Sequence, residues 1–133
     1  MGWRIATDLM ERIVAEAAAS PAAEICGLLL GSGEVVEEAR ACRNVSPDPA
    51  TRFEIDPAAL LAAHRQARAG GPAILGCYHS HPSGRAEPSP RDAADAAPNG
   101  WLWIIVGASE VKGWRAVEGG ALHQRFDGTD WAS

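Results

Sequence analysis

The stretch CYHSHPSGRAEPSPRD, residues 77–92, carries two histidines two positions apart in front of a loop rich in proline and serine. It overlaps the apolar segment AILGCYHSH (73–81), whose composition predicts a buried strand. Proline cannot donate to a sheet ladder, so Pro82 predicts the end of that strand. Because alternate residues of a strand point to the same face, we expect His79 and His81 to project side by side.

The end of the same stretch predicts the start of a helix. Ser89 is the expected N-cap, Pro90 takes the first helical position and Asp92 lies in the first turn. Two neutral imidazoles and one carboxylate form a three-ligand zinc set that leaves a fourth position for water. Each part also has an ordinary interpretation, since Ser-Pro-x-Asp is a common capping pattern and two nearby histidines occur by chance. The whole string, His-x-His-Pro, six residues and then Ser-x-x-Asp, favours the metal site.

Outward from this stretch, the pattern predicts a mixed sheet with helices packed on it, an α/β (α+β) fold in a single domain over residues 1–133. Helices are expected over residues 6–20 and 56–71, with a short third helix that starts at Ser89 and stops by Pro98. Strands are expected at 24–31, 34–42, 73–81, 101–107, 110–117 and 121–126, and a short extended piece at 52–55.

The first two helices have recognisable starts. Thr7 or Asp8 is the expected cap of the first helix, and Asp56 before Pro57 is the expected cap of the second. The first helix should pack through one apolar face, formed by Leu9, Ile13, Val14 and Ala17.

Composition excludes several classes of function. The chain has a net charge of −5 without a basic run, so a nucleic-acid partner is not expected. No apolar run approaches the roughly 20 residues of a membrane span, and the first residues lack an apolar signal core, so we expect no membrane contact and a cytoplasmic location. The three cysteines are odd in number and form no Cys-x-x-Cys pair, which argues against a disulfide framework or a zinc ribbon.

The motif resembles that of the JAMM metalloproteases, also called MPN-plus or JAB domains. That family has an upstream glutamate, His-x-His-Pro, six residues, Ser, two residues and Asp, and this chain matches at Glu24, His79, His81, Pro82, Ser89 and Asp92. The stretches PAAEICGLLLG, the loop at Asn44, RFEIDP with Phe53 and ILGCYHSHP also resemble short prokaryotic members. One departure is Cys77, where relatives commonly have a bulky aromatic residue.

The resemblance implies a zinc-dependent hydrolase. It assigns His79, His81 and Asp92 as zinc ligands, and Glu24 and Ser89 as catalytic groups. Glu24 would act as general acid and base, and the Ser89 hydroxyl would stabilise the developing oxyanion. The implied reaction is cleavage of an amide or isopeptide bond after the Gly-Gly tail of a ubiquitin-like or sulfur-carrier protein, with a peptide as the other possible substrate. The chain lacks the insertions with which larger eukaryotic relatives hold ubiquitin chains, so a polyubiquitin substrate is not expected.

Two other functions compete with this hypothesis. An MPN scaffold would bind partners without chemistry, although such relatives usually lack the metal ligands that this chain has. A zinc deaminase would need His-x-Glu followed by Pro-Cys-x-x-Cys, and neither part occurs.

The sequence also predicts the orientation or role of several other residues. Ser80 should face away from the two histidines and can fix the turn at Pro82. Cys77 shares the face of the histidines and is a minor candidate for an additional ligand. His64, in a helix, and His123, in a late strand, are expected to be ordinary residues. Trp101, Trp103 and Trp114 are expected in the core, with one of them as a possible wall of the substrate groove.

Overall fold

The computed structural model describes residues 2–133 as one eight-stranded sheet with three helices. The strands are β1 (Trp3–Ile5), β2 (Cys26–Ser32), β3 (Val35–Cys42), β4 (Ala73–Ser80), β5 (Leu102–Val106), β6 (Val111–Gly120), β7 (Gln124–Thr129) and β8 (Trp131–Ala132). The helices are α1 (Thr7–Ala18), α2 (Pro57–Arg68) and α3 (Pro90–Asp95).

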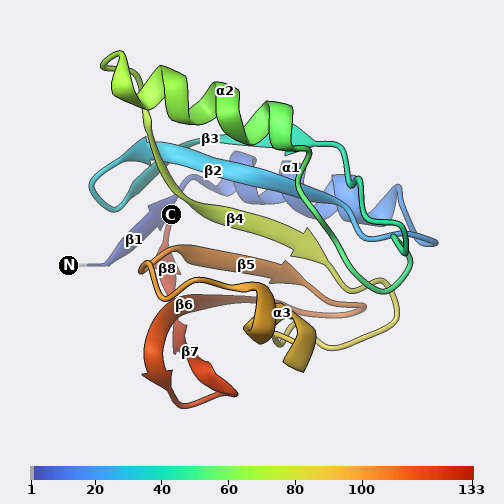
Figure 1. Cartoon of the computed structure of the whole chain (residues 1–133). Coiled ribbons are helices and arrows are strands. Elements are labelled where there is room, and N and C mark those ends of the chain that lie inside the picture. The colour runs from blue at the N-terminus through green and yellow to red at the C-terminus, as the bar shows by residue number, and fades with distance from the viewer. Residues whose placement is uncertain (1) are drawn as a thin grey trace.

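The sheet is mixed, as the sequence predicts. Its strand order is β7-β6-β5-β4-β2-β3-β1-β8, with parallel pairs β4/β5, β1/β3 and β1/β8 among antiparallel neighbours. Helix α1 covers one face, and α2 and α3 lie on the other (Figure 1). This arrangement places β4, the strand that ends in the histidine motif, in the interior of the sheet.

Burial on both faces explains why the central strands are apolar without alternation. Leu29 of β2 packs with Ile13 of α1 on one face. Leu28 and Leu30 pack with Ala63 of α2 on the other. Helices α1 and α2 therefore cover the middle of the sheet on its two faces. The strand ends lie outside these contacts and can carry polar residues.

The start of α2 is confirmed and the start of α1 is not. Asp56 caps α2, since its Oδ1 accepts a hydrogen bond from Ala58 N at 3.0 Å. In α1 neither Thr7 nor Asp8 caps, because Ala6 occupies the N-cap position and makes no side-chain hydrogen bond. The helix follows β1 directly, so strand pairing sets where α1 begins. Its expected apolar face is also too wide, because Val14 is 38% exposed.

The C-terminal strands differ in extent from the prediction. The strand expected at 121–126 begins only at Gln124, because His123 and Gln124 have φ angles of 53° and 57° and form a turn. Strands β1 and β8 were not predicted. They have three and two residues and pair with each other, so each is too short for a period-2 pattern. None of the helices within residues 2–133 combines the length and the apolar character needed to cross a membrane.

A candidate metal centre at the end of strand β4

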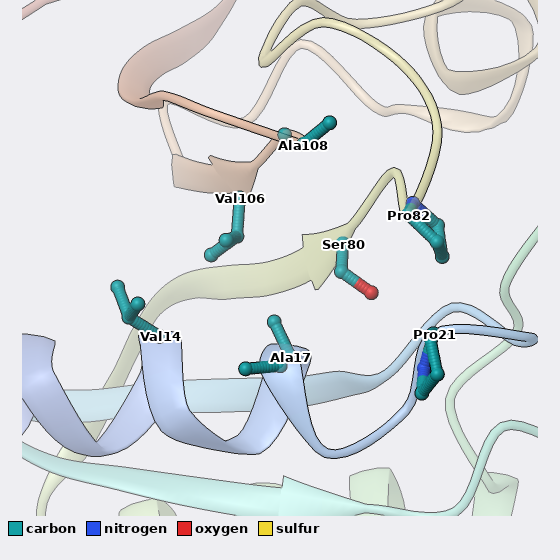
Figure 2. A pocket seen from close by; sticks show the side chains of 9 residues that line it. Val14, Ala17, Pro21, Ser80, Pro82, Val106 and Ala108 are labelled. Carbon is teal, nitrogen blue, oxygen red and sulfur yellow. The ribbon is translucent and has the colours of Figure 1, made fainter.

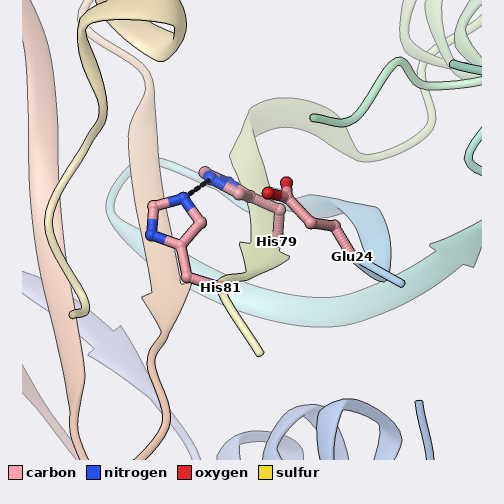
Figure 3. A group of neighbouring side chains, drawn as sticks. All are labelled: Glu24, His79 and His81. Atoms are coloured by element: carbon pink, nitrogen blue, oxygen red, sulfur yellow. Dashed lines mark hydrogen bonds between the residues drawn. The ribbon is translucent and has the colours of Figure 1, made fainter. Parts of the chain in front are cut away.

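Strand pairing brings the two histidines together. His79 lies in β4, opposite Cys26 of β2 and Ile105 of β5, and is fully buried. His81 follows the strand, and its backbone N–H donates to Val106 O at 2.8 Å. The Nε2 atoms of the two imidazoles lie 3.0 Å apart (Figure 3). The prediction from strand alternation that both rings project from one face is therefore confirmed.

The start of α3 directs a carboxylate at the same point. Ser89 Oγ accepts from Asp92 N at 3.0 Å and Asp92 Oδ2 accepts from Ser89 N at 2.9 Å, so the two residues form a capping box. The same Oδ2 lies 3.2 Å from His79 Nε2 and 3.3 Å from His81 Nε2. Capping thus fixes the orientation in which the Asp92 carboxylate meets both imidazoles.

Glu24 reaches the histidines from the segment that precedes β2. One ligand atom from each of Glu24, His79 and His81 lies within 4.8 Å of the other two, and the three side chains point toward one another (Figure 3). Glu24 is 5% exposed, and its Oε1 has no hydrogen-bond partner among the described residues. Two carboxylates, Glu24 and Asp92, therefore accompany one pair of imidazoles.

Ser80 holds the Glu24 segment in place. Its Oγ accepts from Ile25 N at 2.9 Å, and its own backbone N–H donates to Ile25 O at 3.2 Å. Ser80 faces away from the histidines, as expected, into a pocket of about 190 Å³ between the end of α1 and the ends of β4 and β5 (Figure 2). The expectation that Ser80 fixes the turn at Pro82 is wrong, because its hydroxyl bonds to Ile25, the neighbour of Glu24, instead.

The donor set fits a metal ion. His81 Nδ1 lies 2.8 Å from Arg85 O, and a carbonyl only accepts, so Nδ1 carries the proton and Nε2 of the neutral ring keeps its lone pair. That lone pair and the Asp92 carboxylate converge with His79 Nε2 at separations of 3.0 to 3.3 Å. Tetrahedral zinc, with bonds of about 2.0–2.1 Å to nitrogen and oxygen, separates its ligand atoms by about 3.3 Å.

Burial and charge set the protonation of the cluster. Burial raises the pKa of Glu24 to about 7, with the nearby His81 lowering it and Asp92 raising it further. Burial would raise the pKa of Asp92 as well, but the hydrogen bonds with His79 and His81 outweigh burial and hold the pKa below its usual range. Burial lowers the pKa of His79, which favours the neutral imidazole that metal binding requires.

Aromatic side chains wall the cluster. The ring of Phe53 stacks on His79 with centroids 4.2 Å apart and an interplanar angle of 22°. Trp103 is 6% exposed and meets both rings edge-on. Phe53 lies in the 43–56 loop, which Asn44 organises by donating to Glu24 O and Arg52 O and accepting from Ser46 N and Glu54 N.

A pocket of about 330 Å³ adjoins the cluster at Asp92. It is lined by Arg52, Phe53, Glu54, Ile55, Leu60, Cys77, Asp92, Asp95, Trp101 and Trp103. Cys77 is 2% exposed, and burial raises its pKa well above the usual value, so the thiol stays protonated. The group formed by Glu24, His79 and His81 contains neither Cys77 nor Asp92, but Asp92 Oδ2 contacts both imidazoles directly.

The expectations for the remaining tryptophans and histidines are met only in part. Trp103 is buried in the core, whereas Trp101 and Trp114 are partly buried and pack against it; Trp101 and Trp103 both line the pocket beside Asp92. His64 is exposed on α2. His123 lies in the turn before β7, where its Nε2 is 3.2 Å from Pro88 O.

Comparison with known proteins agrees with this geometry. Residues 6–118 match a family model described as prokaryotic homologues of the JAB domain. The chain belongs to this prokaryotic JAB family. The JAB domain described here resembles a probable TtuB-protein conjugate cleaving protease of Thermus thermophilus, with 40% identity over 95 residues that make up 70% of this chain and 62% of that protein.

Two further similarities extend the comparison. A desampylase of Haloferax volcanii is 31% identical over 107 residues, which cover 76% of this chain and 77% of the desampylase. A solution structure of a protein from Desulfitobacterium hafniense superposes with a TM-score of 0.77 at 28% identity, covering 94% of this chain and 88% of the other. The expected family and fold class are therefore confirmed for this JAB domain.

Proposed function

We propose that this JAB domain is a zinc-dependent isopeptidase that cleaves after the C-terminal Gly-Gly of a ubiquitin-like or sulfur-carrier protein. The observation that carries the proposal is the convergence of His79 Nε2, His81 Nε2 and Asp92 Oδ2 at 3.0 to 3.3 Å, with a second buried carboxylate, Glu24, beside them. A purely structural domain has no reason to accumulate these groups, because burying them without a cation costs stability.

His79, His81 and Asp92 would hold the zinc ion. Bound zinc in such a three-ligand set supplies an activated water at neutral pH and polarises a carbonyl oxygen. Asp92 is the better third ligand, because its Oδ2 contacts both imidazole nitrogens directly. Glu24 remains without a hydrogen-bond partner at Oε1 among the described residues and is left for proton transfer.

Glu24 would take a proton from the attacking water and pass it to the leaving amine. A carboxylate whose pKa is raised to about 7 by burial is suited to both directions of transfer, because neither protonation state is strongly favoured at neutral pH. The Ser80 hydrogen bond to Ile25 N holds the segment that carries Glu24 against β4. The base therefore approaches the histidines on a fixed backbone.

Ser89 would donate its hydroxyl proton to the oxygen that becomes negative in the tetrahedral intermediate. Its Oγ already accepts a hydrogen bond from Asp92 N, which fixes the position of the oxygen. Within residues 2–133 no acceptor for the hydroxyl proton is found, so that proton is free to be donated to substrate. Capping and oxyanion stabilisation use different sides of one hydroxyl and are compatible. Because water is the nucleophile, Ser89 forms no acyl-enzyme.

The substrate class follows from the proteins that the chain resembles. One is named for cleavage of TtuB-protein conjugates and the other is named a desampylase. The aligned segment is 62% of the length of the first relative, so the activity of the whole relative enters here as a proposal. A glycine tail can approach the cluster closely because it has no side chains. The pocket beside Asp92, with Phe53, Trp101 and Trp103 in its lining, offers an apolar surface for the adjoining substrate residues.

Zinc analysis and a cleavage assay on the same sample test the proposal. Purified protein should contain one zinc per chain and release the linked peptide from a Gly-Gly isopeptide conjugate, followed by mass spectrometry. His81→Ala should lose both, since two remaining ligands bind zinc weakly. His64→Ala is the matched control, because His64 is an exposed histidine of α2, and it should retain both.

Protein without zinc after reconstitution would contradict the metal site and favour a scaffold role. Stoichiometric zinc without cleavage of any Gly-Gly conjugate would preserve the metal site and contradict the substrate. The two halves of the proposal are thus tested separately.

A further inference from the structure

One peptide unit links the metal cluster to a carboxylate on the far side of the 82–88 loop. The carbonyl of Arg85 accepts a hydrogen bond from His81 Nδ1 at 2.8 Å. The N–H of the same peptide unit, at Ala86, donates to Glu110 Oε2 at 3.0 Å. In a planar trans peptide the N–H and C=O point in opposite directions. Carboxylate, peptide and imidazole therefore form one continuous chain of hydrogen bonds.

The loop is docked tightly on the turn between β5 and β6. Trp114 Nε1 donates to Ala86 O at 2.9 Å, and Ala108 N donates to Gly84 O at 2.9 Å. Ala86 is fully buried. A Cβ atom at Gly107 would lie 2.7 Å from Ala86 N, so only glycine lets the loop approach this closely. The Arg85–Ala86 peptide is thus held from both ends and cannot rotate away from His81.

We propose that Glu110 is a positioning residue for His81, acting through the Arg85–Ala86 peptide. A carboxylate that accepts the N–H polarises the peptide and makes its carbonyl a stronger acceptor for His81 Nδ1. The bond then fixes the Nδ1–H tautomer, directs Nε2 toward His79 and Asp92 and raises its basicity as a ligand. The inference rests on the metal site of the proposed function.

The charge of Glu110 is maintained by its neighbours. Lys112 Nζ lies 3.7 Å from Glu110 Oε1, and Arg85 Nε lies 3.9 Å from Oε2. The hydrogen bond from Ala86 N also lowers the pKa of Glu110. The residue therefore carries a full negative charge where it meets the peptide, which a neutral acceptor would not supply.

Zinc affinity, measured by competition with a chromophoric chelator, provides the first test. Glu110→Ala removes the acceptor and should weaken zinc binding roughly 10- to 100-fold, the usual effect of losing a partner of a metal-binding histidine. Glu110→Gln keeps an acceptor but loses the charge, and a smaller loss of roughly 3- to 10-fold is expected. Glu87→Ala is the matched control, because Glu87 pairs with the same Arg85 at 3.6 Å without bonding to the peptide, and it should keep wild-type affinity.

The tautomer of His81 in the metal-free protein provides the second test. Long-range ¹H–¹⁵N spectra, recorded at alkaline pH so that the His81 ring is neutral, should show Nδ1–H in the wild type and in Glu87→Ala, and a mixture with Nε2–H in Glu110→Ala. A role confined to holding the loop would lower the melting temperature of Glu110→Gln without changing its zinc affinity.

Several outcomes would overturn the inference. They are a Glu110→Gln variant that binds zinc within about twofold of the wild type, an unchanged tautomer in folded Glu110→Ala, or an equal loss in Glu87→Ala. If Glu110→Ala does not fold, Glu110→Gln decides. A wild-type protein that binds no zinc would contradict the proposed function, and the tautomer spectra would still test the link from Glu110 to His81.

Discussion

The two faces of strand β4 differ in whether their buried polar groups have hydrogen-bond partners. On the α1 face, Tyr78 is 1% exposed and its hydroxyl donates to Glu16 Oε1 at 2.9 Å. Ser80, on the same face, accepts from Ile25 N. Each buried polar side chain named on this face has a partner, as is usual in protein interiors.

On the opposite face, two buried polar atoms of the metal cluster lack partners among the described residues. His79 is fully buried, yet its Nδ1 has no hydrogen-bond partner among residues 2–133, and neither has Glu24 Oε1. Acceptor atoms of His81 and Asp92 are crowded together beside them. One strand can therefore serve stability on one face and function on the other. The rule that buried polar groups find partners is broken at the face that carries the site.

The largest effect on turnover is expected from a change at Glu24, the glutamate beside the two histidines. Glu24→Gln keeps the size of the side chain but cannot accept a proton at neutral pH, so turnover should fall by a factor of about 10²–10⁴. Zinc content should stay at the wild-type level, because Glu24 is not among the proposed ligands. The measurement is cleavage of a Gly-Gly conjugate by protein of known zinc content.

Glu16→Gln is the matched control for this prediction, since Glu16 is the carboxylate on the α1 face. It should keep wild-type turnover. Wild-type cleavage by zinc-loaded Glu24→Gln would remove Glu24 from the mechanism. Loss of zinc in Glu24→Gln would instead make Glu24 part of the metal-binding set.

The difference between the faces also explains how much could be predicted from the sequence. His79 and His81 follow from the alternation of a strand, and Ser89 and Asp92 from a capping pattern, because both signals are local. Glu24 had only a family resemblance to support it. Its approach depends on the pairing of Cys26 with His79, a long-range register that local patterns do not contain.

No local sequence pattern indicated the residues that support the site from a distance. Glu110 and Trp114 meet the 82–88 loop only because β5 and β6 form a hairpin beneath it. Phe53 was noted as part of a similar stretch, but its stacking on His79 requires the folded 43–56 loop. Strands β1 and β8 are too short for any pattern, and they determine where α1 begins more than Thr7 or Asp8 do.

An intermediate effect is expected at Ser89, which has a structural and a chemical role in one hydroxyl. Ser89→Ala should lower turnover by about 10²–10³ through loss of the oxyanion donor. It should also lower the free energy of unfolding by about 1 kcal/mol through loss of the cap. Turnover at saturating substrate and denaturant unfolding measure the two effects independently.

Asp56→Ala supplies the comparison for Ser89, because Asp56 caps α2 through Ala58 N and lies outside the proposed catalytic set. It should lose similar stability, about 1 kcal/mol, and keep its turnover. If Ser89→Ala behaves like Asp56→Ala, with normal turnover and reduced stability, the hydroxyl is only a cap and the oxyanion role is wrong.

The smallest effect on activity is expected on the α1 face. Tyr78→Phe removes the hydroxyl that donates to Glu16 and keeps the ring that fills the space above Gly27. The free energy of unfolding should fall by about 1.5 kcal/mol, the lower end of the range for a hydrogen bond to a charged group, since Glu16 is only partly buried and regains water. Zinc affinity and turnover should match the wild type, although Tyr78 is adjacent to His79 in the chain. A loss of turnover beyond about threefold at full zinc occupancy, measured well below the unfolding transition, would show that the α1 face positions His79. The separation of β4 into a structural and a functional face would then be wrong, because the two faces would be coupled through the backbone of the strand.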